Sequence, residues 1–214
     1  MPNNYEQEVC NILKETKIHQ RLEELRERTK ATGYEHAFNV CSDGRVTEVI
    51  GGSEKRIDTA KIKKECNNKI DIGIHSHPYS VPYPSTLDFI SELRDQPRIA
   101  DCVYGAIGDS ITCYRTSDEL RNKYVPLLEE SSNKINEIVI RYYNTNDQEE
   151  RHRLYEEYKI EHNRFTYLTN IIKHIIIKDI YPGITSIHDY SIKASRNPNF
   201  GNFRDVWVKD CGKI

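Results

Sequence analysis

Two histidines, a serine and an aspartate lie close together in one stretch of the chain that could bind a metal ion. The segment IGIHSHPYSVPYPSTLDF contains His75, His77, Ser85 and Asp88. Imidazole and carboxylate groups are common zinc ligands, and a catalytic zinc needs three protein ligands and one open position. The histidines and the aspartate could supply these ligands. The chemistry that this set predicts is hydrolysis by a metal-activated water.

The histidines belong to an expected strand, KIDIGIH. Successive side chains of a strand point to opposite faces. Gly73, His75 and His77 should therefore share one face, where the glycine leaves space, whereas Ile70 and the two isoleucines after it should point into the core. This alternation makes the two imidazoles neighbours. An HxH pair on a strand is nevertheless more often structural than metal-binding.

The serine and the aspartate open an expected helix from Ser85 to about Arg94. The proline-restricted loop before it cannot continue as helix. Residues three apart share a helix face, so Ser85 and Asp88 should point together toward the loop and the histidines. Serine is also a favoured N-cap, and an acid in the first turn suits the helix dipole. Each half of the pattern is ordinary, but H-x-H, seven residues and S-x-x-D together are specific.

This joint pattern resembles the JAMM motif of the MPN+ (JAB1/MPN/Mov34) metalloproteases. The resemblance covers roughly residues 1–125. It implies an α/β fold, a cytidine-deaminase-like MPN/JAB domain with a mixed central sheet flanked by helices. It also implies zinc (Zn²⁺) as cofactor, held by His75, His77 and Asp88, with a water as the fourth ligand. Ser85 would donate a hydrogen bond to the developing oxyanion.

The family also has an upstream glutamate that acts as general base. The best match is Glu35 in YEHAFNV, on an expected strand that follows the N-terminal helix. Glu48 and Glu54 follow soon after and stay as alternatives, although Glu48 also suits a solvent-facing strand position. His36, next to Glu35, should point to the opposite face and be structural.

Enzymes of this family are mostly isopeptidases, so the resemblance implies a substrate as well. It predicts hydrolysis of a peptide or isopeptide bond at the C-terminus of ubiquitin or of a ubiquitin-like modifier or carrier protein. Two alternatives stay open: a non-catalytic MPN-type scaffold, and a nucleic-acid-associated protein that uses the C-terminal extension. For the second, the tail interleaves basic and aromatic residues that could stack on single strands: Lys193, Arg196, Phe200, Phe203, Arg204 and Trp207.

The elements around the motif predict three segments. Residues 1–125 form the metalloprotease domain, with a helix at 4–30 ending near Gly33, about five strands, and a short helix at 58–67. Residues 126–180 form a helical extension, because apolar residues recur at helical spacing over 127–143 and 148–178. Residues 181–214 are expected to be an irregular tail. The extension could be a substrate-docking surface, a dimer interface or a cover on the sheet, and the oligomeric state is unknown.

Composition limits the partners and the location. The 214 residues carry a formal net charge of -2, so there is no global basic field for nucleic acid. The apolar runs are too short to span a membrane, and because MPNNYEQEVC has neither the basic start nor the apolar run of a signal peptide, we expect none. The six cysteines form no CxxC pair, which predicts reduced thiols in a cytoplasmic protein.

Overall fold

The strands join in one mixed sheet with the order β2-β1-β3-β4-β5-β7-β6. The computed structural model describes residues 5–53, 57–79, 82–180, 201–202 and 206–213. β3 and β4 pair in parallel and are connected by the crossover helix α4, whereas all other neighbouring strands of this sheet pair antiparallel. The strands are β1 (His36–Cys41), β2 (Ile50–Gly51), β3 (Ile70–His77), β4 (Ala100–Gly105), β5 (Ser110–Thr116), β6 (Gly201–Asn202) and β7 (Val206–Gly212).

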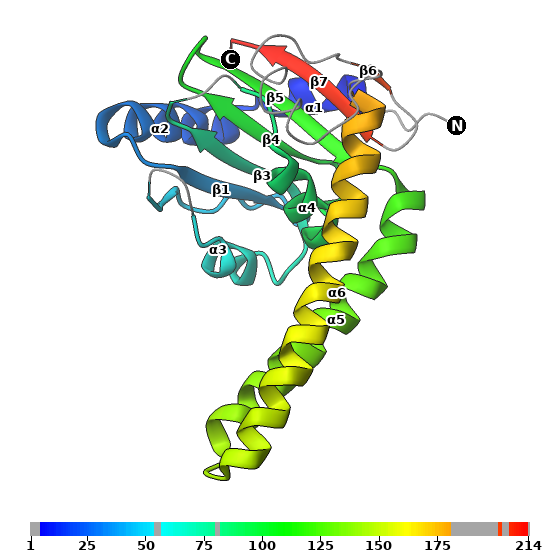
Figure 1. Cartoon of the computed structure of the whole chain (residues 1–214). Helices are drawn as coiled ribbons and strands as arrows, with labels where there is room; N and C mark the ends of the chain where they lie inside the picture. The colour runs from blue at the N-terminus through cyan, green and yellow to red at the C-terminus, as the bar shows by residue number, and fades with distance from the viewer. Residues whose placement is uncertain (1–4, 54–56, 80–81, 181–200, 203–205, 214) are drawn as a thin grey trace.

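Two helices, α1 (Tyr5–Ile12) and α2 (Thr16–Thr32), cover one face of the sheet (Figure 1). Leu13, Leu22 and Leu25 pack there against the isoleucines of β3. We expected one helix over 4–30, and the structure instead breaks it before Thr16. The predicted end is confirmed: Gly33 has φ 67° and its N–H donates to the Thr29 carbonyl at 3.0 Å, which is the left-handed cap that glycine favours.

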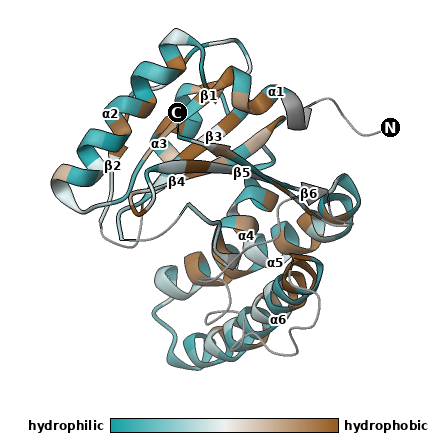
Figure 2. Ribbon diagram, turned by 90° about the horizontal axis from the view of Figure 1, so that it is seen from above, coloured by the Kyte–Doolittle hydropathy of each residue, from teal (hydrophilic) through white to brown (hydrophobic). Residues whose placement is uncertain are grey.

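The opposite face is covered by four helices: α3 (Ala60–Glu65), α4 (Thr86–Asp95), α5 (Asp118–Asn144) and α6 (Gln148–Ile180). Phe89 and Leu93 of α4 pack with Tyr114 of β5, the start of α5 and the last turns of α6 in one core. Figure 2 shows α1 and α2 on one side of the sheet and α4, α5 and α6 on the other. The sheet is therefore the middle layer of three.

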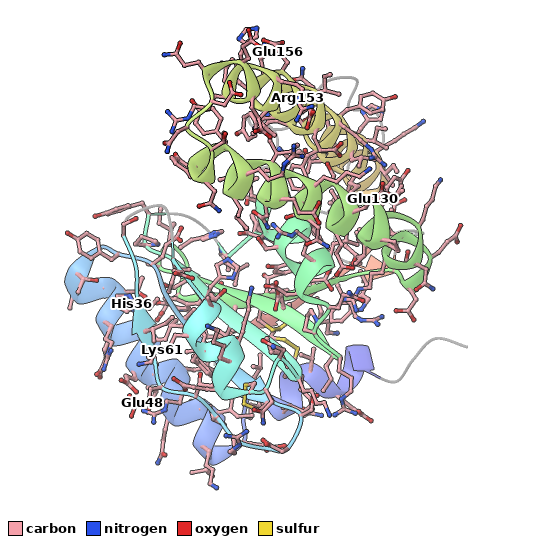
Figure 3. All side chains as sticks on the ribbon, turned by 90° about the horizontal axis from the view of Figure 1, so that it is seen from below. His36, Glu48, Lys61, Glu130, Arg153 and Glu156 are labelled. Carbon is pink, nitrogen blue, oxygen red and sulfur yellow. A yellow bond between two sulfur atoms is a disulfide. The ribbon has the colours of Figure 1, made fainter. Side chains whose placement is uncertain are left out.

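The expected helical extension is confirmed as an antiparallel pair, α5 and α6, and both helices are longer than the predicted ranges. Their far halves extend well beyond the sheet (Figure 1). Many charged side chains cover this projection, among them Glu130, Arg153 and Glu156 (Figure 3). Only the near halves contribute to the core on the sheet.

The C-terminal segment differs from the irregular tail that we expected. Its described residues form β6 and β7, and β7 pairs with β5 over the length of that strand. Val206 and Val208 are buried, because alternate residues of β7 face the core. Of the residues considered for nucleic-acid binding, only Trp207 lies within the described residues, and it packs partly buried against the sheet.

The prediction of reduced thiols is wrong. All six cysteines form disulfides, because strand pairing and helix packing bring their side chains together. These bonds join Cys10 to Cys211, Cys41 to Cys66, and Cys102 to Cys113. Disulfides persist mainly in oxidising compartments, so they weigh against the cytoplasmic location that we predicted from the cysteines.

Among the described residues, no helix is both long and apolar enough to cross a membrane.

Candidate metal centre

The histidine pair stands at the C-terminal end of β3. His75 and His77 face the side of the sheet that carries α3 and α4, whereas Ile72 and Ile74 pack under α1 and α2, as alternation predicted. Ile70 differs from the prediction. It clusters with the Cys41–Cys66 disulfide, because the register between β1 and β3 shifts after Val40.

Asp88 completes a group of three side chains whose ligand atoms converge. Nε2 of His75 lies 3.2 Å from Nε2 of His77, and the two nitrogens lie 3.3 and 3.4 Å from the carboxylate oxygens of Asp88. Zinc bonds to such atoms are about 2.0–2.1 Å long, so tetrahedral ligands are separated by about 3.3 Å. The separations and the donor types both fit a zinc ion. This is the group of three among the described residues that could hold a metal.

The first turn of α4 orients Asp88. The Ser85 hydroxyl accepts a hydrogen bond from the Asp88 N–H at 3.2 Å, and the Ser85 N–H donates to Oδ2 of Asp88 at 2.5 Å. This reciprocal capping box fixes the carboxylate at the helix start. The Ser85 hydroxyl hydrogen stays available, because the cap uses the oxygen only as an acceptor. The expected helix cap is confirmed, and it leaves Ser85 able to donate toward the cleft.

Glu35 lies next to β1, at the position that antiparallel register places opposite His77. The pairing of Ala37 with His75 fixes this register, and residues directly opposite point to the same face. Two backbone hydrogen bonds hold the segment in place: the Glu35 N–H donates to the Ser53 carbonyl at 2.7 Å, and the Gly52 N–H donates to the Glu35 carbonyl at 2.8 Å. Glu35, His75, His77, Ser85 and Asp88 line one cleft. The structure therefore brings together the residues that the sequence predicted.

The other acids and the neighbouring histidine behave differently. Glu48 is exposed and stands apart from the helical pair (Figure 3), and it does not line the cleft. Glu54 lies outside the described residues. His36 is buried on the opposite face, as predicted, where its Nδ1 lies 3.0 Å from the Tyr34 carbonyl oxygen. Of the two candidate glutamates that lie within the described residues, Glu35 lines the cleft beside the histidines and Glu48 does not.

The charges of the group influence one another. Burial opposes the charged form of Asp88, but the two imidazoles beside it hold its pKa well below the usual range. Burial likewise opposes protonation of His75, and the Asp88 carboxylate more than offsets this, so the pKa of His75 is raised. Burial raises the pKa of Glu35, and the nearby histidines reduce that rise. An acid with a raised pKa is suited to accept and return a proton.

The cleft has a volume of about 1070 Å³. Residues of α4 form one of its walls, and residues of α6 form the other. The α6 side chains that line it recur at helical spacing: His162, Phe165, Thr166, Thr169, Asn170 and Lys173. The extension is therefore both a cover on the sheet and a wall of the cleft. The sequence did not single out these residues, because their stripe faces the cleft only once α6 has packed beside α4.

Sequence reasoning also missed three polar residues on the cleft floor, Asn39, Asp101 and Tyr114. Burial, together with the neighbouring Asp95, raises the pKa of Asp101 to about 7. Strand alternation could have placed each residue on a face of its own strand. It could not have shown that their strands are neighbours.

The chain matches no family model and no curated protein. The residues of the cleft are therefore the basis on which a function is inferred.

Proposed function

We propose that the chain is a zinc-dependent peptidase or isopeptidase of the JAMM/MPN+ type. Its substrate would be a peptide or isopeptide bond at the C-terminus of ubiquitin, or of a ubiquitin-like modifier or carrier protein. The observation that carries the proposal is the convergence of His75, His77 and Asp88 at zinc-ligand separations, with Glu35 and Ser85 lining the same cleft. The fold would then be the cytidine-deaminase-like MPN/JAB domain with a C-terminal helical extension.

The roles of the residues follow from their chemistry. A bound zinc ion supplies Lewis acidity and lowers the pKa of water to about 7. Glu35 would take a proton from the attacking water and return it to the leaving amine, a role that its raised pKa favours. Ser85 would donate its hydroxyl hydrogen to the carbonyl oxygen as negative charge develops there. Asp88, fixed by the capping box, would hold its geometry throughout.

The shape of the cleft supports a polypeptide substrate. Its floor is the sheet, one wall is α4 and the other is α6, and the space between them is open to solvent. An extended C-terminal tail can lie along such an open cleft, with its side chains contacting the walls. The polar residues of α6 would then contact the substrate beside the scissile bond.

The test is cleavage by the zinc-loaded full chain. A panel of ubiquitin and ubiquitin-like proteins, as lysine conjugates and as C-terminally extended precursors, should include one that is cut after its terminal glycine. Glu35→Gln should lower the rate by about 10²–10⁴-fold, the usual contribution of a general base, while zinc stays stoichiometric. Glu48→Gln, a change of the same kind at an exposed acid, is the matched control and should leave the rate unchanged.

The proposal is wrong if the wild-type chain with stoichiometric zinc cuts no member of the panel and Glu35→Gln behaves identically. If Glu35→Gln and Glu48→Gln lower the cleavage rate equally, Glu35 is not the general base.

A further inference from the structure

A row of polar residues crosses the cleft floor next to the metal-binding group. Strand register pairs Asn39 with Gly73, Gly73 with Asp101, and Asp101 with Tyr114, so four neighbouring strands contribute one residue each. All four residues line the cleft. His75 follows Gly73 by two positions on the same face, which is about 6.6 Å along the strand. The row therefore lies two residues along β3 from His75, one of the predicted zinc ligands.

Two polar atoms of this row are buried without a hydrogen-bond partner. Asn39 and Tyr114 are 4% and 0% exposed, and neither Nδ2 of Asn39 nor the Tyr114 hydroxyl has a hydrogen-bond partner among the described residues. Asp101 forms no ion pair with any described residue, because the nearby Lys63 pairs with Asp95 at 2.6 Å. Buried polar groups almost always form hydrogen bonds, and a buried group without a partner lowers the stability of the fold. Unpartnered buried polar atoms on residues that line a cleft point to a ligand.

The glycine gives this row its shape. A Cβ atom at Gly73 would lie 2.1 Å from Oδ1 of Asp101 and 3.7 Å from Oδ1 of Asn39. The Asp101 carboxylate thus lies over the bare backbone of Gly73, and the Asn39 amide oxygen faces the same place. Tyr114 occupies the neighbouring position of the row, and its hydroxyl is buried. Asn39, Asp101 and Tyr114 each bring an oxygen that can accept a hydrogen bond to this row, and the row carries one negative charge when Asp101 is ionised.

We propose that Asn39, Gly73, Asp101 and Tyr114 form a binding subsite for a primary ammonium group of the substrate. An ammonium group carries three N–H donors and one positive charge, which match three acceptor oxygens and one carboxylate. Calcium needs six to eight oxygen ligands, and a niche with a single carboxylate does not supply them. The unpartnered Nδ2 of Asn39 can donate to a carbonyl of the same ligand.

The place of this ammonium in the reaction rests on the proposed function. The flexible four-carbon stem of lysine can span the two-residue distance, about 6.6 Å, between the row and the predicted zinc ligand His75. The subsite would therefore select a substrate with a lysine side chain next to the scissile bond. Binding of the ammonium itself does not depend on hydrolysis.

The test is a titration of the zinc-loaded full chain with n-butylammonium chloride, followed through the side-chain amide signal of Asn39 by NMR. We expect a saturable shift, and no shift with 1-butanol, which lacks the charge. Asp101→Asn keeps the shape but removes the charge and should weaken binding about tenfold or more, as expected for a charged hydrogen bond. Tyr114→Phe should weaken it less. Gly73→Ala should abolish the shift, because the new Cβ displaces Asp101.

The matched control is Asp109→Asn, since Asp109 pairs with Lys30 outside the cleft and should not affect binding. Thermal unfolding of each variant shows whether it is folded. The proposal is overturned if butylammonium does not saturate, if 1-butanol binds equally, or if Asp101→Asn binds like wild type. A shift produced by Mn²⁺ in place of butylammonium would make the niche a second metal site, which also overturns it. If the chain binds butylammonium but cleaves no substrate, the proposed subsite is supported and only the proposed function is wrong.

Discussion

Ser85 and Asp88 each combine a structural role, the helix cap, with a proposed chemical role in the same few atoms. The hydrogen bonds of the capping box begin α4 and at the same time fix the carboxylate that faces His75 and His77. A helix cap and a metal ligand are therefore not competing interpretations of Asp88. The cap holds the carboxylate of this proposed ligand in place without a metal.

Replacement of Ser85 separates these two roles. Ser85→Ala removes a cap worth about 1 kcal/mol and a hydroxyl that could stabilise the oxyanion. Loss of an oxyanion donor usually lowers kcat by about 10²–10³-fold. Ser117→Ala is the matched control, because Ser117 caps α5 through the same kind of bond, to the Leu120 N–H at 3.1 Å. Both variants should lose similar stability in urea unfolding, and only Ser85→Ala should lose activity. Equal activity in the two variants would contradict the catalytic role of Ser85.

At the scale of elements, α4 is held in place by a buried ion pair. Arg121 of α5 donates to Glu92 of α4, and Glu92 also accepts from the Thr116 N–H at 3.0 Å and the Thr116 hydroxyl at 2.6 Å. Both charged side chains are buried, at 7% and 0% exposure. The pair thus joins α4, α5 and β5, and α4 carries Asp88 into the cleft.

Arg121→Met should destabilise the chain strongly. It leaves the Glu92 carboxylate buried without its partner, which usually costs about 3–5 kcal/mol. Lys134→Met breaks an exposed pair with Glu130, at 2.7 Å, and should cost less than about 1 kcal/mol. Urea unfolding of the two variants measures the difference. Zinc affinity should fall in Arg121→Met only, because α4 positions Asp88. Similar unfolding free energies for the two variants would show that the buried pair does not hold α4.

A second ion pair links the start of β3 to the segment before β4. Arg98 donates to Asp71 at 2.7 Å through Nε, and the Ser42 hydroxyl donates to Asp71 at 2.6 Å. Burial opposes the charged form of Asp71, but these bonds more than offset it and lower its pKa. The stabilisation is therefore present above the unfolded pKa of about 3.9 and is lost as the pH falls through the lower folded value.

Asp71→Asn should accordingly be less stable than wild type at neutral pH, and the difference should shrink below about pH 4. Urea unfolding at several pH values measures it. Asp43→Asn is the control, since Asp43 pairs with Arg45 on the surface and should change stability little. A difference between Asp71→Asn and wild type that stays constant down to the lowest pH would contradict this assignment.

At the scale of the whole molecule, the two ends of the chain are joined. The disulfide between Cys10 and Cys211 links α1 to β7 across a separation of 201 residues. Cys102 and Cys113 face each other across β4 and β5, only 11 residues apart. A cross-link stabilises mainly by restricting the unfolded chain, and more so for a longer loop.

Removal of the long-range disulfide should cost more than removal of the short one. In the chain-entropy model the double replacement Cys10→Ser/Cys211→Ser loses up to about 5 kcal/mol, against about 3 kcal/mol for Cys102→Ser/Cys113→Ser. Thermal unfolding of the oxidised proteins, with thiol counting by mass spectrometry, measures both. If wild type has six free thiols when purified without reductant, the disulfides are absent and the cytoplasmic location regains support.

Much of the candidate site follows from the sequence alone, because it depends on local geometry. Strand alternation fixes which face carries His75 and His77, and helix periodicity joins Asp88 to Ser85, all within one short segment. The five strands before residue 116 and the helical pair are equally local patterns, and the structure confirms them.

Only the tertiary structure decided which distant residues meet. Glu35 reaches the histidines through the pairing of β1 with β3, and Asp101 and Tyr114 reach Gly73 through the pairing of β3, β4 and β5. The addition of β7 to the sheet and the three disulfides depend on the same long-range packing. Strand order and register come from burial of whole faces, which no local pattern of residues specifies. The sequence therefore determined the predicted metal ligands, and the tertiary structure determined the cleft around them.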